Sequence, residues 1–202
     1  LSEARPVLGA PRPNPPDARA SGMISLARYL RVQEQLVALE PYARSQSSQR
    51  QAGAPIDMLL AWMLYANGKH EDLRQLHERM EPELQQALAT SRDPSNPAMQ
   101  LVELYGMQGD VAQLNEVVRF YDEELKPDYM RPIETGNTIP VAYALAGDID
   151  SAMERAEAIE KQFGIWSFWP YHFDPAFDPY REHPRYRALD DRYLAWLEEQ
   201  NP

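Results

Sequence analysis

Apolar residues recur at helical spacing along most of the chain, in runs that end at a glycine and then start again. In the clearest case, 142–153, an apolar run reaches Gly147-Asp148 and a second amphipathic run follows at once. Glycine can adopt the left-handed conformation that ends a helix, and an aspartate can accept from the free amides of the next helix. We therefore predict a helix hairpin with its elbow at Gly147, and the same pattern predicts elbows at Gly68 and Gly109.

The same periodicity bounds the helices on either side of each elbow. No stretch alternates apolar and polar residues as a β-strand does, so the predicted fold class is all-α. Pro82 is expected to start a new turn within the second helix, and Pro140 to kink or delay the fifth. The hairpin helices are predicted over 55–66 and from residue 70 to Leu88, over 98–107 and 110–125, and over 132–146 and 148–163; outside them, helices are predicted over 21–39 and 42–51.

The three elbows share residue types at three further positions when they are aligned on their glycines. These are the positions at which the two helices of a hairpin press together. A large residue lies four before each glycine (Leu64, Tyr105, Tyr143), a small or apolar one five after it (Leu73, Leu114, Ala152), and His77, Val118 and Ala156 lie nine after it.

This pattern resembles the tetratricopeptide repeat, a helix–turn–helix unit of about 34 residues. The best match consists of Tyr143, Gly147, Asp148, Ala152 and Ala156. The chain departs from the family in three ways: successive glycines are 41 and 38 residues apart, the early tryptophan is absent, and Leu73 and Leu114 replace a small residue. The resemblance implies a short α-α solenoid over 55–163, with a concave face lined by the first helix of each pair. A general α-α solenoid is the alternative.

The C-terminal stretch predicts a cap on the last hairpin. Asp174-Pro175 and Asp178-Pro179 each fit an N-cap aspartate followed by proline at the first helical position. A last helix begins at His183-Pro184 and should cover the exposed end of the helical stack. The apolar side chains expected in this cap are Phe173 and Phe177 in the seam, and Tyr186, Leu189, Tyr193, Leu194 and Leu197 on the helix.

Residues 173–189 are also similar to the closing motif of many bacterial tetratricopeptide proteins. In that group the repeats stand beside cyclase, kinase or winged-helix regulatory domains. The resemblance implies the sensor or scaffold part of a larger bacterial regulatory protein, in the cytoplasm or the periplasm. The start at Leu1 is consistent with a fragment or a processed product.

The composition divides the chain into a tail and one domain. Five prolines fall within 1–20, which we expect to form an extended linker, with a ligand for an aromatic groove as the functional alternative. Residues 21–202 are expected to form a single domain: N-terminal helices over 21–53, three hairpins over 55–163, and a capping segment over 164–202. Self-association through an uncovered end of the helical stack, near 24–39, is a further possibility that the sequence allows.

The net charge and the sequence motifs exclude several classes of partner and activity. A formal net charge of −11 argues against nucleic acid and against an anionic membrane surface, and no apolar run is long enough to span a bilayer. The chain has no cysteine, phosphate loop or nucleophile elbow, so we predict neither an enzyme nor a bound cofactor. A metal site formed by His172, Asp174, Asp178 and His183 matches no zinc or calcium spacing.

These arguments favour an interaction module that binds a protein or peptide along the first-helix face. A second interpretation is a sensor that binds a small molecule beside the aromatic segment 163–173. The face carried over from the family consists of Met58, Trp62, Tyr65, Met99, Glu103, Met107, Asn137 and Val141, and the aromatic pocket of Trp166, Phe168, Trp169 and Tyr171. The C-terminal segment of the chain itself could equally fill that face.

Overall fold

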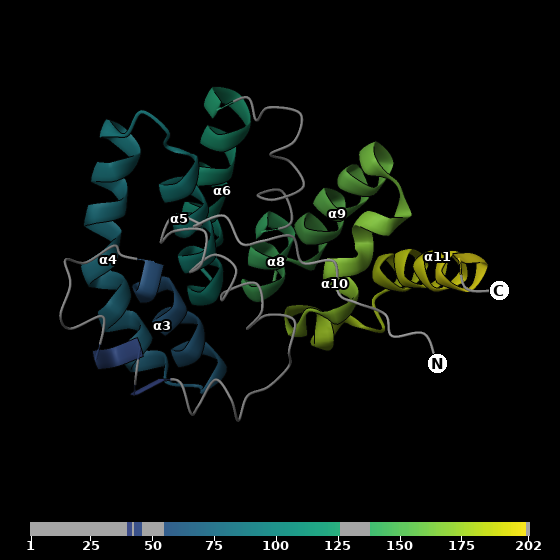
Figure 1. Ribbon diagram of the computed structural model, residues 1–202, viewed down its shortest axis with the longest axis horizontal. Coiled ribbons are helices and arrows are strands. Elements are labelled where there is room, and N and C mark those ends of the chain that lie inside the picture. Colours follow the sequence, from purple (N-terminus) through teal and green to yellow (C-terminus); the bar gives the residue numbers. More distant parts are fainter. Residues whose placement is uncertain (1–39, 42, 46–54, 126–137, 201–202) are drawn as a thin grey trace, which may run out of the picture.

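A computed structural model describes residues 40–41, 43–45, 55–125 and 138–200, and these residues form helices and no strand (Figure 1). The predicted 1–20 tail, the helix over 21–39 and most of the helix over 42–51 lie outside the described residues. The elements are α3 (Pro55–Ala66), α4 (His70–Thr90), α5 (Ser95–Gln108), α6 (Val111–Phe120), η1 (Tyr121–Leu125), α8 (Thr138–Leu145), α9 (Ile149–Phe163), η2 (Ile165–Phe168), α10 (Trp169–Phe173), η3 (Pro175–Tyr180) and α11 (Pro184–Gln200).

The three predicted elbows have the same backbone structure. Gly68, Gly109 and Gly147 all have positive φ angles, of 64°, 75° and 86°. In each elbow the amide after the glycine donates to the carbonyl four residues before the glycine, at 2.9–3.0 Å, which is the hydrogen bond that closes a helix with a left-handed glycine. The side chain of Asp148 accepts from the amide of Ser151 at 3.1 Å, and Asp110 caps α6 in the same way. The predicted hairpin at Gly147 and its cap are therefore confirmed.

The nine aligned positions are all buried. The residues four before, five after and nine after each glycine retain at most 6% of their exposed area. They lie where α3 packs against α4, α5 against α6, and α8 against α9. The alignment thus identified the contact positions of all three hairpins.

Tyrosines on the first helices also link each hairpin to the one before it. The Tyr105 hydroxyl on α5 donates to Glu81 on α4 at 2.7 Å, and the Tyr143 hydroxyl on α8 donates to Asn115 on α6 at 2.6 Å. Burial raises the pKa of Tyr105 to about 12, and its hydrogen bond to Glu81 adds to that shift. Both hydroxyls therefore stay protonated and act as donors between hairpins.

The helix boundaries differ from the prediction at several prolines and ends. Pro82 does not start a new turn, because α4 runs through it as one helix. Helix α5 begins at Ser95, three residues before the predicted start, and α6 changes at Tyr121 into a π-helical turn. Pro140 lies inside α8, which is described from Thr138 onward; residues 132–137, where the prediction started this helix, lie outside the described residues, so the predicted kink or late start stays a prediction.

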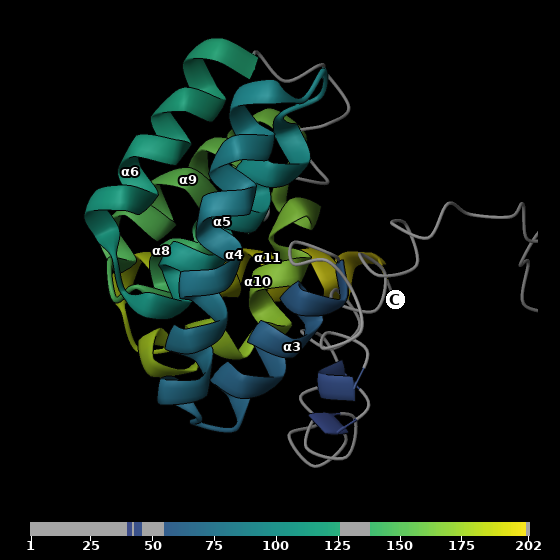
Figure 2. The ribbon, with the colours of Figure 1, turned by 90° about the vertical axis from the view of Figure 1, so that its left-hand side faces the viewer.

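The elements after α9 gather at one end of the molecule (Figures 1 and 2). Element η2 contacts both α9 and α11, whereas η3 packs on α8. Asp174 caps η3 by accepting from the amide of Ala176 at 2.9 Å, as predicted. The second predicted turn, at Asp178-Pro179, does not form, because both residues lie inside η3.

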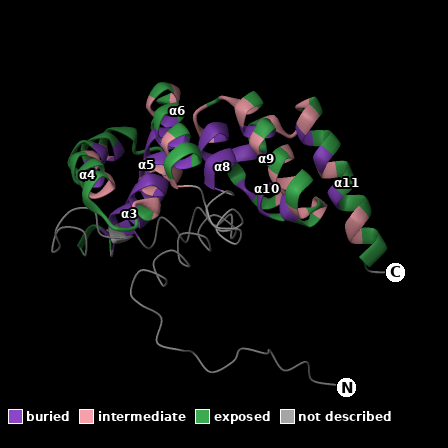
Figure 3. Ribbon diagram, turned by 90° about the horizontal axis from the view of Figure 1, so that it is seen from above, coloured by how far each residue is buried: buried purple, intermediate pink, exposed green. Residues whose placement is uncertain are grey.

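Burial follows this arrangement. Figure 3 shows α5 and α8 buried along most of their length, while α4 and α11 each keep an exposed side. Helix α11 presents Tyr186, Leu189 and Tyr193 to the interior, whereas Leu194 is exposed. No helix in the described part of the chain has both the length and the apolar character of a membrane span.

Candidate functional site: the aromatic C-terminal segment

Most residues of the predicted first-helix face are buried. Tyr65 and Glu103 are partly exposed, and Asn137 lies outside the described residues. The buried members, each with at most 8% of its area exposed, are Met58, Trp62, Met99, Met107 and Val141. At these five positions the face belongs to the core, so a partner has no access to them in this structure.

The C-terminal part of the chain lies close to this face. Burial raises the pKa of Tyr65 on α3, and the charges of Tyr180 in η3 and of Asp174, which caps η3, raise it further. A Cβ atom built on Gly147 would lie 3.9 Å from the Tyr180 hydroxyl. Element η3 packs on α8, which carries Val141, so the C-terminal segment near the face is η3, which follows the aromatic segment 163–173.

The predicted aromatic pocket divides into a buried half and an exposed half. Phe168 and Tyr171 are completely buried, whereas Trp166 and Trp169 keep 44% and 46% of their area exposed. Phe173, which was predicted to fill a seam, is 38% exposed, so that prediction is wrong. Only Phe177 of the predicted pair is buried.

The two buried residues of the predicted pocket, Phe168 and Tyr171, pack against other aromatic rings of the protein. The Phe168 ring centroid lies 5.4 Å from that of Tyr186, 5.7 Å from Tyr171 and 6.2 Å from Tyr193, all in edge-on geometry. Phe177 stacks on Tyr186 at 5.7 Å. Such pairs favour packing beyond their buried area, so Phe168 and Tyr171 form core and do not line a pocket.

The exposed half forms what we call the aromatic face: Trp166, Trp169 and Phe173. These residues are three and four positions apart along the continuous turns of η2 and α10, so their side chains lie on one side. The Trp169 and Phe173 rings meet edge to face at 6.2 Å. Gly164, with a φ of 93°, ends α9 and lets the chain turn into this segment.

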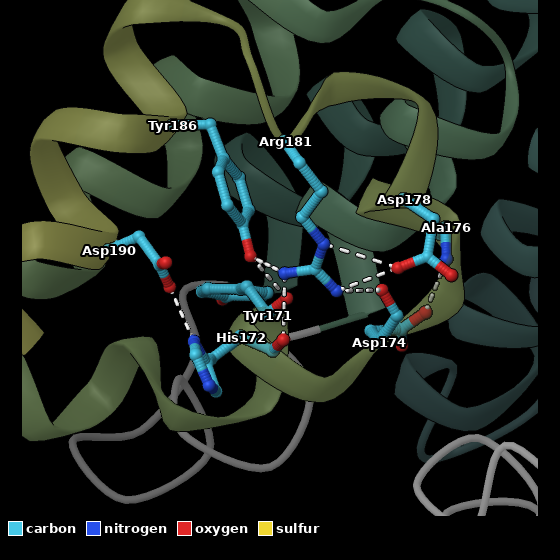
Figure 4. Close-up of polar contacts among 8 residues, drawn as sticks. All are labelled: Tyr171, His172, Asp174, Ala176, Asp178, Arg181, Tyr186 and Asp190. Carbon is cyan, nitrogen blue, oxygen red and sulfur yellow. Dashed lines mark hydrogen bonds and ion pairs between the residues drawn. The ribbon is translucent and has the colours of Figure 1, made fainter. Parts of the chain in front are cut away.

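Arg181 holds the backbone at the end of α10, as Figure 4 shows. Its Nη1 donates to the carbonyl of His172 at 2.7 Å and also contacts the Tyr186 hydroxyl. Its Nη2 and Nε donate to Asp178 Oδ1 at 2.9 and 3.2 Å. The Tyr186 hydroxyl in turn donates to the carbonyl of Tyr171 at 3.3 Å. The guanidinium thus ties the end of α10 to η3 and α11.

His172 and Asp190 form the polar edge of the aromatic face. His172 Nδ1 lies 2.5 Å from Asp190 Oδ1, across from α10 to α11 (Figure 4). The imidazole ring also meets Phe173 edge to face at 4.6 Å and packs on Tyr193 at 5.3 Å. Burial raises the pKa of Tyr193, and Asp190 adds to the shift. The pair therefore fixes the ring against which Phe173 rests.

The residues considered for a metal site have other roles. His172 pairs with Asp190, Asp174 caps η3, and Asp178 binds Arg181. Over the described ranges, no three His, Cys, Asp or Glu side chains come together in a way that could hold a metal ion.

No family model matches this chain. No curated protein and no solved structure matches it either. The function is therefore argued from its own residues.

Two contributors to this segment, Arg181 and Asp190, had no role in the sequence analysis, and a third, Phe173, was predicted to be buried. Arg181 lies within the motif over 173–189, and nothing in the local sequence shows that it donates to the carbonyl of His172 in α10. Asp190 pairs across 18 residues, which no spacing rule predicts. The exposure of Phe173 did carry a signal, since Trp166, Trp169 and Phe173 are spaced as one side of a helix.

Proposed function

We propose that this chain is a non-enzymatic protein-interaction module, built on tetratricopeptide-like helix hairpins, that binds a protein segment through the aromatic face. One observation carries this proposal. Among the described residues, the large apolar side chains that remain exposed are Trp166, Trp169, Phe173 and Leu194, and three of these four belong to the eight-residue stretch 166–173.

The chemistry of the aromatic face suits binding. Tryptophan is enriched among the residues that dominate protein interfaces, because a large ring buries much area at a small cost in side-chain entropy. The backbone at the end of α10 is held by Arg181, and Phe173 is held by the ring of His172. A surface fixed before binding loses less entropy when it binds, which favours affinity.

The scaffold part of the proposal rests on the hairpins. Three elbows with one backbone geometry and nine buried contact positions support a repeated helix–turn–helix unit. The motif over 173–189 supports a place beside a regulatory domain in a larger bacterial protein, as a scaffold or sensor. Because most of the first-helix face is buried, we place partner binding at the aromatic face.

The test is site-specific photo-crosslinking in cells that express the protein. Trp169 is replaced by the photoreactive residue p-benzoylphenylalanine, and the exposed Glu83 on α4 is replaced in a matched control. We expect one defined protein adduct at position 169 that is absent at position 83 and is lost when Phe173→Ala is added. Equal labelling at both positions, or no adduct at 169, would exclude binding through this face.

A small-molecule sensor is the second candidate, supported by the half-exposed rings of Trp166 and Trp169. The effect of added compounds on the melting temperature distinguishes the two candidates. A compound that raises the melting temperature of the wild type but not of Trp169→Ala, in the absence of a protein adduct, would favour the sensor.

A further inference from the structure

We infer that the occupant of the aromatic face is the Pro- and Arg-bearing segment 1–20 of this same chain, docked on Trp169 and Phe173. This inference rests on the proposed function in one respect, namely that the aromatic face is a binding surface. Beyond the proposed function, the inference identifies the segment that binds to this face. The segment lies outside the described residues.

The first argument is chemical. Exposed aromatic rings recognise proline-rich segments in several unrelated protein modules, because the flat pyrrolidine ring packs well on an aromatic ring and a proline-rich chain loses little entropy when it binds. Pro13 and Pro16 in the segment have the P-x-x-P spacing of such ligands. Trp169 and Phe173, edge to face at 6.2 Å, offer two ring surfaces at an angle to each other.

The charge of segment 1–20 also favours its binding to this domain. The whole chain has a formal net charge of −11, yet 1–20 contains three arginines (Arg5, Arg12, Arg19) against two acids (Glu3, Asp17). The segment is therefore weakly basic, and it belongs to a strongly acidic chain. At the edge of the aromatic face, Asp190 has oxygen lone pairs beyond the one engaged by His172, and an arginine can use them. A second copy of the domain would instead bring like charge to the same surface.

The chain between segment 1–20 and the described domain is long enough for the segment to contact the aromatic face. The described structure begins at Glu40, and the helix that the sequence predicts over 21–39 would span about 28 Å at about 1.5 Å per residue. A domain of this size has a radius of gyration of roughly 15 Å. Residues 17–20, when extended, add about 13 Å, and the total of about 40 Å is comparable with the diameter of such a domain, which allows Pro13 and Pro16 to reach the aromatic face.

The experiment uses the full-length chain and its lack of cysteine. Ala10→Cys creates a single thiol for a nitroxide spin label, and the indole N–H signals of Trp62, Trp166, Trp169 and Trp196 are recorded by NMR. We expect the Trp169 signal to lose most of its intensity. The loss should be largely reversed when the five prolines of 1–20 are replaced by alanine, and also by Phe173→Ala. The reference intensity of each indole is taken from the same sample after the nitroxide is reduced with ascorbate.

A mixed sample identifies the source of the effect. Isotope-labelled chains without the spin label are combined with unlabelled chains that carry it. If docking occurs within one chain, the mixture shows no loss at Trp169, and the loss in the singly labelled sample does not change on dilution. A loss at Trp169 in the mixture, or a loss in the singly labelled sample that shrinks on dilution, would assign the face to a second copy and overturn the inference.

The outcomes also separate this inference from the proposed function. If the proline substitutions do not restore the Trp169 signal, or if the signal never weakens, the segment is not the occupant. A protein adduct at position 169 would still support the proposed function in that case. If the segment docks but no separate protein is ever crosslinked, the inference stands and the interaction module is excluded.

Discussion

Gly106 on α5 lies directly against Ala142 on α8. A Cβ atom built on Gly106 would lie 2.7 Å from the Cα atom and 2.8 Å from the carbonyl oxygen of Ala142. Both neighbours are backbone atoms, which cannot move aside as a flexible side chain can. The first helices of the second and third hairpins therefore depend on a glycine for their close approach.

Gly106→Ala should accordingly destabilise the fold. Overpacking of a close contact typically costs about 1–3 kcal/mol, and the better helix propensity of alanine recovers up to about 1 kcal/mol. We expect a net loss of about 1–2 kcal/mol in the free energy of unfolding, measured in urea. Asn96→Ala, at an exposed position of the same helix, should change it by less than about 0.5 kcal/mol. If Gly106→Ala leaves the free energy of unfolding unchanged, α5 and α8 can move apart without loss of stability.

Asp148→Ala should cost about 1 kcal/mol, because it removes the acceptor for the Ser151 amide and hydroxyl at the start of α9. Asp148→Asn keeps a side-chain oxygen that can accept from the amide, so it should stay close to the wild type. Urea unfolding of the two variants checks the cap. A similar loss for both would mean that the charge, and not the hydrogen bond, stabilises this elbow.

Arg181→Lys should be nearly as harmful as Arg181→Ala. A single ammonium cannot reproduce the fork that reaches the His172 carbonyl and Asp178 together, and the carbonyl would lose its charged donor. We expect a loss of about 2 kcal/mol for each, together with faster amide hydrogen exchange over α10 and η3. Arg187→Ala removes an exposed pair with Glu182 and should change stability by under about 0.5 kcal/mol. If lysine restores full stability, the bidentate geometry is not what holds this segment.

Glu40 predicts a dependence of stability on acid pH. Burial by itself would raise the pKa of Glu40, but hydrogen bonds from Lys69, Arg44 and Asn67 outweigh it and lower the pKa from 4.5 to about 2. These contacts lie at 2.8 Å and hold the first elbow, where Lys69 stands in place of a capping aspartate.

A carboxylate with a depressed pKa contributes stability above its unfolded pKa and loses that contribution as the pH falls toward its folded pKa. The Glu40 contribution should therefore be complete above about pH 4.5 and should shrink between there and about pH 2. Glu40→Gln should destabilise the protein more at pH 6 than at pH 3, as measured by urea unfolding at both values. An equal effect at the two values would show that Glu40 titrates normally in the folded protein.

The sequence predicted the hairpins better than the C-terminal segment, for a physical reason. The elbow at Gly147 depends on residues within a few positions of each other, and α9 ends at Phe163 as predicted. The burial of Met58 or Val141 depends on what packs over the first helices, which no local pattern contains. For the same reason helical spacing could not separate Pro82 as a turn from Pro82 inside a continuous α4.

Phe168 and Trp169 are neighbours in sequence with opposite environments, and substituting them tests the division between core and aromatic face. Phe168 is completely buried among three tyrosine rings, so Phe168→Ala should cost about 3–5 kcal/mol. Trp169 is 46% exposed, so Trp169→Ala should cost about 1 kcal/mol or less and remove the protein adduct. Thermal and urea unfolding give the first quantity, and crosslinking from a photoreactive residue at position 166 gives the second. If Trp169→Ala unfolds the domain, Trp169 is a structural residue and the binding surface must be sought elsewhere.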